Sequence, residues 1–138
     1  MEISWLAVIV ATIAMFAVGA VWYMVFFSKT WGEIHGFDKL SKKEQKEMQS
    51  KMGPYYAVQL IVTLISAVVL AGLLSQMPTV SPYKIVFMTW LGFVMPAQVS
   101  AVFFGGTDQK WTVKKICIMS AETLLHLIVA AWVINAVQ

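Results

Sequence analysis

The chain has 138 residues, of which 59% are hydrophobic and 12% charged, and its mean hydropathy is +0.75. Soluble domains average about 45–50% apolar and about 25% charged residues, so this composition favours a protein that faces lipid. All ten basic residues are lysines. The lack of arginine argues against nucleic acid as a partner, because arginine is the usual reader of base edges and phosphates.

Four apolar stretches are long enough to cross a bilayer. A spanning helix needs about 20 mainly apolar residues to cross about 30 Å of hydrocarbon, and lipid favours helices because all their backbone hydrogen bonds are internal. The first stretch lacks the basic start and the cleavage site of a signal peptide, so we interpret it as retained. The sequence predicts one all-α domain, a four-transmembrane-helix bundle over residues 1–138, with spans at about 3–27, 54–76, 85–104 and 113–137.

A polar linker, residues 28–52, joins the first two spans. Within it, Ser41 followed by Glu44 is a capping-box pattern, and we expect a short surface helix from about Ser41 to Met52. His35 is interpreted as a surface residue. The linker either docks anionic headgroups or a protein partner, or is a solvated connector, and its interspersed acids favour the connector.

Lysines lie almost entirely on one side of the predicted bundle. Six fall in the linker and three near the turn between the last two spans, against Lys84 alone on the other side. Such an excess marks the cytoplasmic face, so we expect a cell inner membrane protein with a cytoplasmic linker and both termini outward. Tryptophans near the span ends agree, with Trp5 and Trp132 at the outer interface and Trp31 and Trp111 at the inner one.

Two ionisable side chains fall inside a predicted span. Glu122 and His126 are four residues apart in the last span, so they share one helical face, which Met119 extends. Intramembrane ionisable residues are costly and are functional hypotheses by default. Three interpretations stay open: a structural pair that ties helices together, a transported-ion or proton site, and a metal or other ligand site.

Polar residues of the other spans are predicted at a similar depth. The half of the bundle that contains Glu122 also contains Tyr23 from the first span, Gln59 and Thr63 from the second, and Gln98 from the third. Ser66 and His126 are expected near the midplane. Polar groups from several helices at one depth suggest a shared polar interior that opens toward the linker side.

Pro96 falls in the middle of the third span. It removes one backbone hydrogen bond and frees a carbonyl one turn earlier, near Gly92. Either this carbonyl lines a cavity, or the proline only shapes the bundle. Gly92, Pro96 and Ser100 also form a stripe of small residues that permits close helix approach. Because so small a bundle encloses little by itself, we expect a homo-oligomer, most simply a two-fold dimer.

Several motifs together resemble a known family. They are the Val-Gly-Ala-Val-Trp-Tyr of 18–23 with Phe26–Trp31 after it, Lys51–Tyr56 at the start of the second span, and Trp90–Pro96 in the third. Over nearly the whole chain the sequence resembles the bacterial domain-of-unknown-function 1761 family of small four-span membrane proteins. The resemblance implies a four-helix membrane fold and brings no settled activity with it.

Enzymatic signatures such as His-Glu-x-x-His, Gly-x-Ser-x-Gly or a phosphate-cradling glycine loop are missing from the sequence. We therefore expect no enzyme, no cofactor and no metal. The favoured function is permease-like or channel-like passage of a small ion, proton or solute, with Glu122 and His126 as the titrating pair. The alternative is a structural or accessory membrane protein that binds lipid or a membrane partner.

Overall fold

The four apolar stretches form the four long helical segments of the computed structural model, which describes residues 2–138. Each segment is long and apolar enough to cross a membrane, as an integral membrane protein requires, and no strand occurs within that range. The segments run over Trp5–Phe26, Gly53–Gln76, Pro82–Phe104 and Gln109–Val137. The predicted all-α class with four spanning helices is confirmed.

Two of the four segments contain a π-helical turn, at the end of the first segment and within the third. The first consists of α1 (Trp5–Val21) and the turn Trp22–Phe26, and the third of α5 (Pro82–Thr89), the turn Trp90–Val94 and α6 (Met95–Phe104). The third begins three residues before the predicted start at 85, because Pro82 is tolerated in a first helical turn. The second segment is α4 (Gly53–Gln76), and the fourth contains α7 (Thr112–Val137).

The linker is mostly helical. The expected surface helix is α3 (Lys42–Ser50), which ends two residues before the predicted Met52. Its capping box is present, since the Ser41 hydroxyl accepts from the Glu44 amide and the Glu44 carboxylate accepts from the Ser41 amide, each at 3.2 Å. A second short helix, α2 (Ser28–Ile34), was not predicted and directly follows the first segment.

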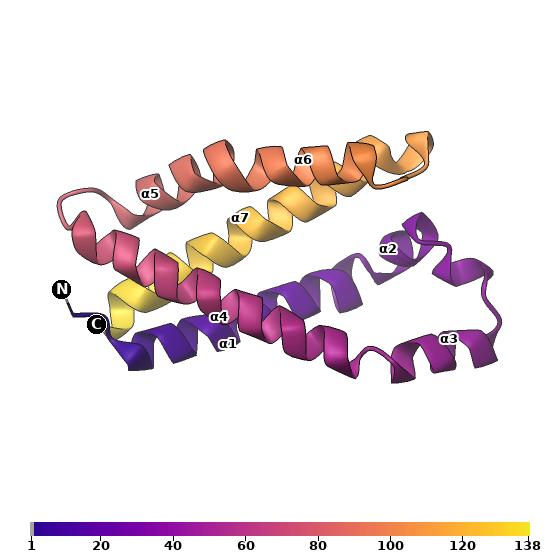
Figure 1. Cartoon of the computed structure of the whole chain (residues 1–138), viewed down its shortest axis with the longest axis horizontal. Helices are drawn as coiled ribbons and strands as arrows, with labels where there is room; N and C mark the ends of the chain where they lie inside the picture. Colours follow the sequence, from indigo (N-terminus) through magenta and orange to yellow (C-terminus); the bar gives the residue numbers. More distant parts are fainter. Residues whose placement is uncertain (1) are drawn as a thin grey trace.

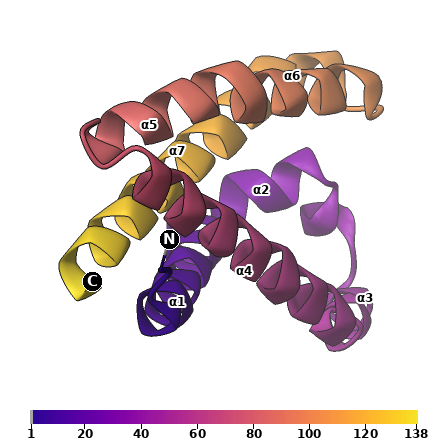
Figure 2. The ribbon, with the colours of Figure 1, turned by 60° about the vertical axis from the view of Figure 1, so that its left-hand side comes forward.

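The helices diverge from one end of the bundle to the other. Both termini lie at one end, here called the terminal end, and α2, α3 and the α6–α7 turn lie at the opposite linker end (Figure 1). The helix α7 packs most extensively against α1, and also against α5 and α6. In contrast, α4 packs on α1 and runs away from α5, α6 and α7 toward the linker end (Figure 2).

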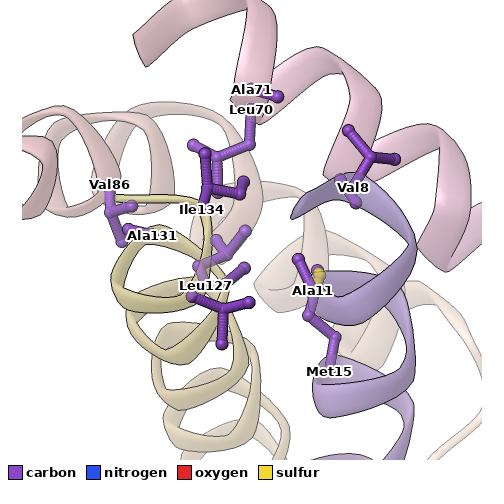
Figure 3. Close-up of a cluster of buried hydrophobic side chains, with 12 residues drawn as sticks. Val8, Ala11, Met15, Leu70, Ala71, Val86, Leu127, Ala131 and Ile134 are labelled. Carbon is purple, nitrogen blue, oxygen red and sulfur yellow. The ribbon is translucent and has the colours of Figure 1, made fainter. Parts of the chain in front are cut away.

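The hydrophobic core fills the terminal half of the bundle. Val8 and Ala11 of α1, Leu70 of α4, and Ala131 and Ile134 of α7 pack against one another there (Figure 3). Alanine side chains keep the helices close, as small residues do in membrane bundles. In the linker half the packing is looser, since every residue of α4 from 53 to 62 is exposed and Thr63 is the first buried one.

Candidate functional site

A cavity of about 560 Å³ lies in the linker half of the bundle, where α4 diverges. All four long segments and α2 contribute to its wall. The six polar residues that the sequence singles out all line it: Glu122, His126, Gln98, Gln59, Thr63 and Tyr23. Residues from four separate spans therefore meet at one site, as their similar predicted depth suggested.

Glu122 and His126 form the most polar part of the wall. The Nδ1 atom of His126 lies 2.8 Å from Oε1 of Glu122, one turn earlier on α7. The side chain of Glu122 is only 6% exposed, whereas that of His126 is 20% exposed. The pair is thus a buried carboxylate held by an imidazole that reaches toward the cavity.

Gly19 of α1 lets this carboxylate fit between two helices. A β-carbon placed on Gly19 would lie 3.3 Å from Oε1 of Glu122, closer than ordinary van der Waals contact. A side chain at position 19 would therefore push on the carboxylate. Gly19 belongs to the Gly-x-x-Trp-Tyr motif of the first span, so this motif places its glycine against Glu122 and its tyrosine in the cavity wall.

Gln98 bonds to Thr123 rather than to the ionisable pair. The Thr123 hydroxyl lies 3.1 Å from Oε1 of Gln98 and accepts a hydrogen bond of 3.1 Å from the indole of Trp90. These bonds connect α6, the π-helical turn before it, and α7 beside Glu122. Thr123 was not singled out in the sequence, although it adjoins Glu122 and also lines the cavity.

Gln59 and Thr63 satisfy one another on α4. The Gln59 amide donates to the Thr63 hydroxyl at 3.3 Å, and that hydroxyl donates to the Gln59 carbonyl at 2.7 Å. Ser66, expected near the same interior, donates to the Val62 carbonyl at 3.1 Å and is absent from the cavity lining. Ser66 shares the helical face of Gln59 and Thr63 but lies beyond Thr63, the last residue of α4 in the lining.

Two tryptophans fix α7 at the level of the site. The Trp22 indole donates to the Ile118 carbonyl at 3.1 Å, and the Trp90 indole donates to the Ser120 carbonyl at 3.0 Å. Each tryptophan is the first residue of a π-helical turn, and such turns are frequent at functional sites. No periodic pattern in the sequence indicates either turn.

Pro96 and Gly92 belong to the third segment. The π-helical turn ends just before Pro96, and the Met95 amide bonds to the Trp90 carbonyl five residues back. Both residues are exposed on the outside of the bundle, where nothing lies within 4 Å of a β-carbon placed on Gly92. Neither Pro96 nor Gly92 is part of the cavity lining, and a helix-shaping role for them stays a prediction.

Aromatic residues supply much of the remaining wall. Tyr55 and Tyr56 at the start of α4, Trp31 of α2 and Phe16 of α1 all line the cavity. The Trp31 ring packs against Tyr23, with ring centroids 4.6 Å apart. The sequence predicts Trp31 at the membrane interface only. The two adjacent tyrosines after Pro54 are the feature from which an aromatic cavity wall could have been predicted.

The metal interpretation gains no support from this geometry. Between residues 2 and 138, no group of three His, Cys, Asp or Glu side chains is placed to hold a metal ion. Met119, which continues the Glu122–His126 stripe along the sequence, is not part of the cavity wall. The other polar groups of the lining are an imidazole, amides and hydroxyls, which suit an organic ligand as well as they suit water.

Comparison with known families decides where the chain belongs. The family described as a protein of unknown function, DUF1761, matches residues 6–135 of the 138. The chain belongs to this family. The resemblance found in the sequence motifs is thereby confirmed, and the cavity residues all fall inside the matched range. Comparisons with curated proteins and with solved structures give no match.

Proposed function

We propose that this protein is a permease-like membrane protein that binds a small solute in the cavity beside Glu122 and His126 and passes it across the bilayer. The observation that carries the proposal is the position of Glu122, a residue only 5% exposed, in the wall of a cavity of about 560 Å³. Burying an ionisable group in a membrane is costly, and such groups mark substrate or proton pathways in many membrane proteins.

The pairing within one helix favours function over structural glue. A structural role for Glu122 and His126 would be to tie two helices together. Instead, both residues belong to α7, and their hydrogen bond joins successive turns of that helix. Interhelical hydrogen bonds beside them are made by other groups, namely Trp22, Trp90 and Gln98. Burying the carboxylate therefore costs free energy, and its hydrogen bond to His126 does not join α7 to another helix.

The size of the cavity favours a solute over a bare ion. Small-molecule sites measure about 300–1,000 Å³, and one water molecule occupies about 30 Å³ of liquid. At about 560 Å³ the cavity is sized for a molecule of several heavy atoms. Among the cargoes that the sequence allowed, a small solute fits best, with proton exchange at the pair as an accompanying step.

The closed terminal half favours a carrier over an open channel. Beyond Met15 the bundle is filled by the packed apolar core, so the polar wall does not continue to the terminal end. Passage would require the helices to separate there, as in alternating access. The linker half of α4 is exposed from 53 to 62, so little packing opposes such movement there.

We further propose that the linker end faces the cytoplasm. Nine of the ten lysines lie at that end, in the linker or around the α6–α7 turn, which supports the orientation through the positive-inside tendency. The cavity would then open toward the cell interior. Labelling of a cysteine introduced at Glu47 of α3 in intact cells tests this, since rapid reaction with an impermeant reagent would contradict it.

Efflux from proteoliposomes tests the proposed function. Vesicles loaded with a mixture of small cationic, neutral, zwitterionic and anionic solutes would be assayed by mass spectrometry for wild type, Glu122→Gln and Glu47→Gln. Glu47 is an exposed residue of α3 and controls for the change in net charge. We expect at least one solute to leave faster with wild type and Glu47→Gln than with Glu122→Gln. Equal rates for every solute would contradict the proposal.

A second cavity supports the alternative, which is an accessory function in lipid binding. A cavity of about 370 Å³ at the linker end is lined by Lys39, Lys110 and Lys115, together with Glu33 and Asp108. Basic pockets at this level of a membrane protein bind anionic headgroups. If lipid binding is the function, Lys39→Gln with Lys110→Gln should abolish retention of anionic lipid during purification while efflux stays unchanged.

A homodimer is also a proposal, supported by the outer face of the third segment. Gly92, Pro96 and Ser100 are all exposed in the single chain and form a face of small side chains, and such faces allow close helix contact. Cross-linking of a cysteine at Ser100 in membranes is expected to yield dimers. A monomer at every protein-to-lipid ratio would contradict this.

A further inference from the structure

We infer that the ligand of the cavity is a small organic cation, an ammonium with apolar substituents. The inference rests on the proposed function and names the class of solute. It follows from three features of the wall: its isolated acidic charge, its aromatic rings and its apolar remainder. Each feature has a separate physical consequence for the ligand.

The charge of the wall selects for a cation. Glu122 is the one acidic residue of the lining, and none of the chain's ten lysines contributes to it. A carboxylate in low-dielectric surroundings attracts an opposite charge far more strongly than it would in water. An anionic solute would face this carboxylate without a compensating lysine, so the wall disfavours anions.

His126 holds one oxygen of the carboxylate in place. Its Nδ1 atom lies 2.8 Å from Oε1 of Glu122, within hydrogen-bond distance. The second carboxylate oxygen makes no hydrogen bond to any other residue of the described chain. This arrangement leaves the carboxyl group of Glu122 fixed in position with its second oxygen available to an ammonium.

The aromatic rings supply the second attraction for an ammonium. Three of the four tyrosines in the chain line the cavity, together with Trp31 and Phe16. The faces of aromatic rings attract cations within about 6 Å, and cages of such rings are how proteins recognise quaternary ammonium groups. The Lys115 ammonium already lies 5.7 Å from the Trp31 ring centroid, outside the cavity lining.

The remainder of the wall favours an organic cation over an inorganic one. Metal cations such as Ca²⁺ take six to eight oxygen ligands, whereas the cavity lining includes the thioethers of Met15, Met24 and Met52. Thioethers are flexible and apolar, and they adapt to ligands of irregular shape. An ammonium with apolar substituents can place its charge near Glu122 and its carbon groups against these side chains.

A charged probe and its carbon isostere test the inference. Phenyltrimethylammonium and tert-butylbenzene share one shape and differ by the exchange of nitrogen for carbon. Binding of each to the protein in lipid nanodiscs would be measured by calorimetry, with empty nanodiscs as the blank for partitioning. We expect the wild type to bind the cation at least ten-fold more tightly than the isostere.

Two variants with matched controls localise the effect. Glu122→Gln should weaken binding of the cation at least ten-fold, whereas Glu47→Gln on the exposed α3 should not change it. Tyr55→Leu should weaken binding about three-fold through the lost cation–π contact, whereas Tyr83→Leu, outside the cavity lining, should not. Because Tyr55 is 67% exposed, its replacement leaves the helix packing intact.

The contradictory outcomes separate this inference from the proposed function. Equal binding of the isostere, or unchanged binding of the cation by Glu122→Gln, would overturn the cation assignment. If neutral or anionic solutes still show Glu122-dependent efflux, the solute-binding function stands and only the class is wrong. If no probe binds and no solute shows such efflux, both proposals fail.

Discussion

The terminal and linker halves of the bundle are built from the same helices but pack differently. At the terminal end, α1, α4 and α7 meet through six alanines that are at most 1% exposed: Ala7, Ala11, Ala67, Ala71, Ala130 and Ala131. At the linker end, the π-helical turn after α1 carries Tyr23 and α4 carries Tyr55 and Tyr56, and these bulky side chains line a cavity of about 560 Å³. Small side chains let backbones approach, so side-chain size decides which half closes. The terminal half, here the closed half, stabilises the bundle through its packed core. Because of this stability, the linker half, here the open half, can contain the buried acid Glu122.

The same enlargement in the two halves should have the most unequal effect. Ala11 of α1 is fully buried in the closed half, whereas Ala20, nine residues later on α1, lines the cavity. Ala11→Leu should destabilise the fold by about 1–3 kcal/mol through overpacking, measured by reversible unfolding in mixed micelles. Ala20→Leu should cost less because the cavity accepts its side chain. Equal losses would mean that the two halves do not differ in packing.

Removing an indole hydrogen bond should show that specific contacts with α7 stabilise the open half. Trp22→Phe deletes the bond to the Ile118 carbonyl and should lower the free energy of unfolding by about 1 kcal/mol. Trp5→Phe is the matched control, because Trp5 is 62% exposed on the outside of the same helix. If the two variants unfold at the same denaturant concentration, the bond from Trp22 contributes nothing measurable.

A single methyl group at Gly19 should alter binding more than stability. In Gly19→Ala the new β-carbon would lie 3.3 Å from Oε1 of Glu122 and would displace the carboxylate by a few tenths of an ångström. Affinity for phenyltrimethylammonium should fall a few-fold, while the better helix propensity of alanine offsets the strain. Gly72→Ala, with open space around it, should leave binding unchanged. Equal affinities for Gly19→Ala and wild type would separate Gly19 from the site.

The smallest effect is expected outside both halves. Ser41→Ala removes one side of the capping box and should destabilise α3 locally by about 1 kcal/mol. Faster amide hydrogen exchange in α3 would report the change, and the unfolding midpoint of the bundle should stay where it is. A lower midpoint would show that α3 supports the bundle instead of acting as an independent surface helix.

Much of this organisation is predictable from the sequence, because lipid imposes a strong rule on it. Apolar length reveals four spans, and an ionisable residue inside a span is conspicuous, so Glu122 and His126 stand out without any structure. Side-chain partners are less predictable, since they depend on helix rotation. Gln98, for example, bonds to Thr123 at 3.1 Å rather than to Glu122 or His126.

The irregular features escaped prediction for a different reason. The π-helical turns that begin at Trp22 and Trp90 insert one extra residue per turn, which no periodic pattern in the sequence announces. The divergence of α4 also depends on packing between distant segments rather than on α4 itself. Trp31 was expected to be an interfacial anchor, and it also lines the cavity because α2 folds back beside Tyr23.

Native mass spectrometry of the protein released from lipid nanodiscs tests most directly whether the cavity holds a ligand at Glu122. Wild type, Glu122→Gln and Glu47→Gln would be compared after incubation with phenyltrimethylammonium. We expect wild type and Glu47→Gln to retain the added mass of the cation and Glu122→Gln to lose it. Retention of the cation by all three proteins, or by none, would contradict a binding site built around Glu122.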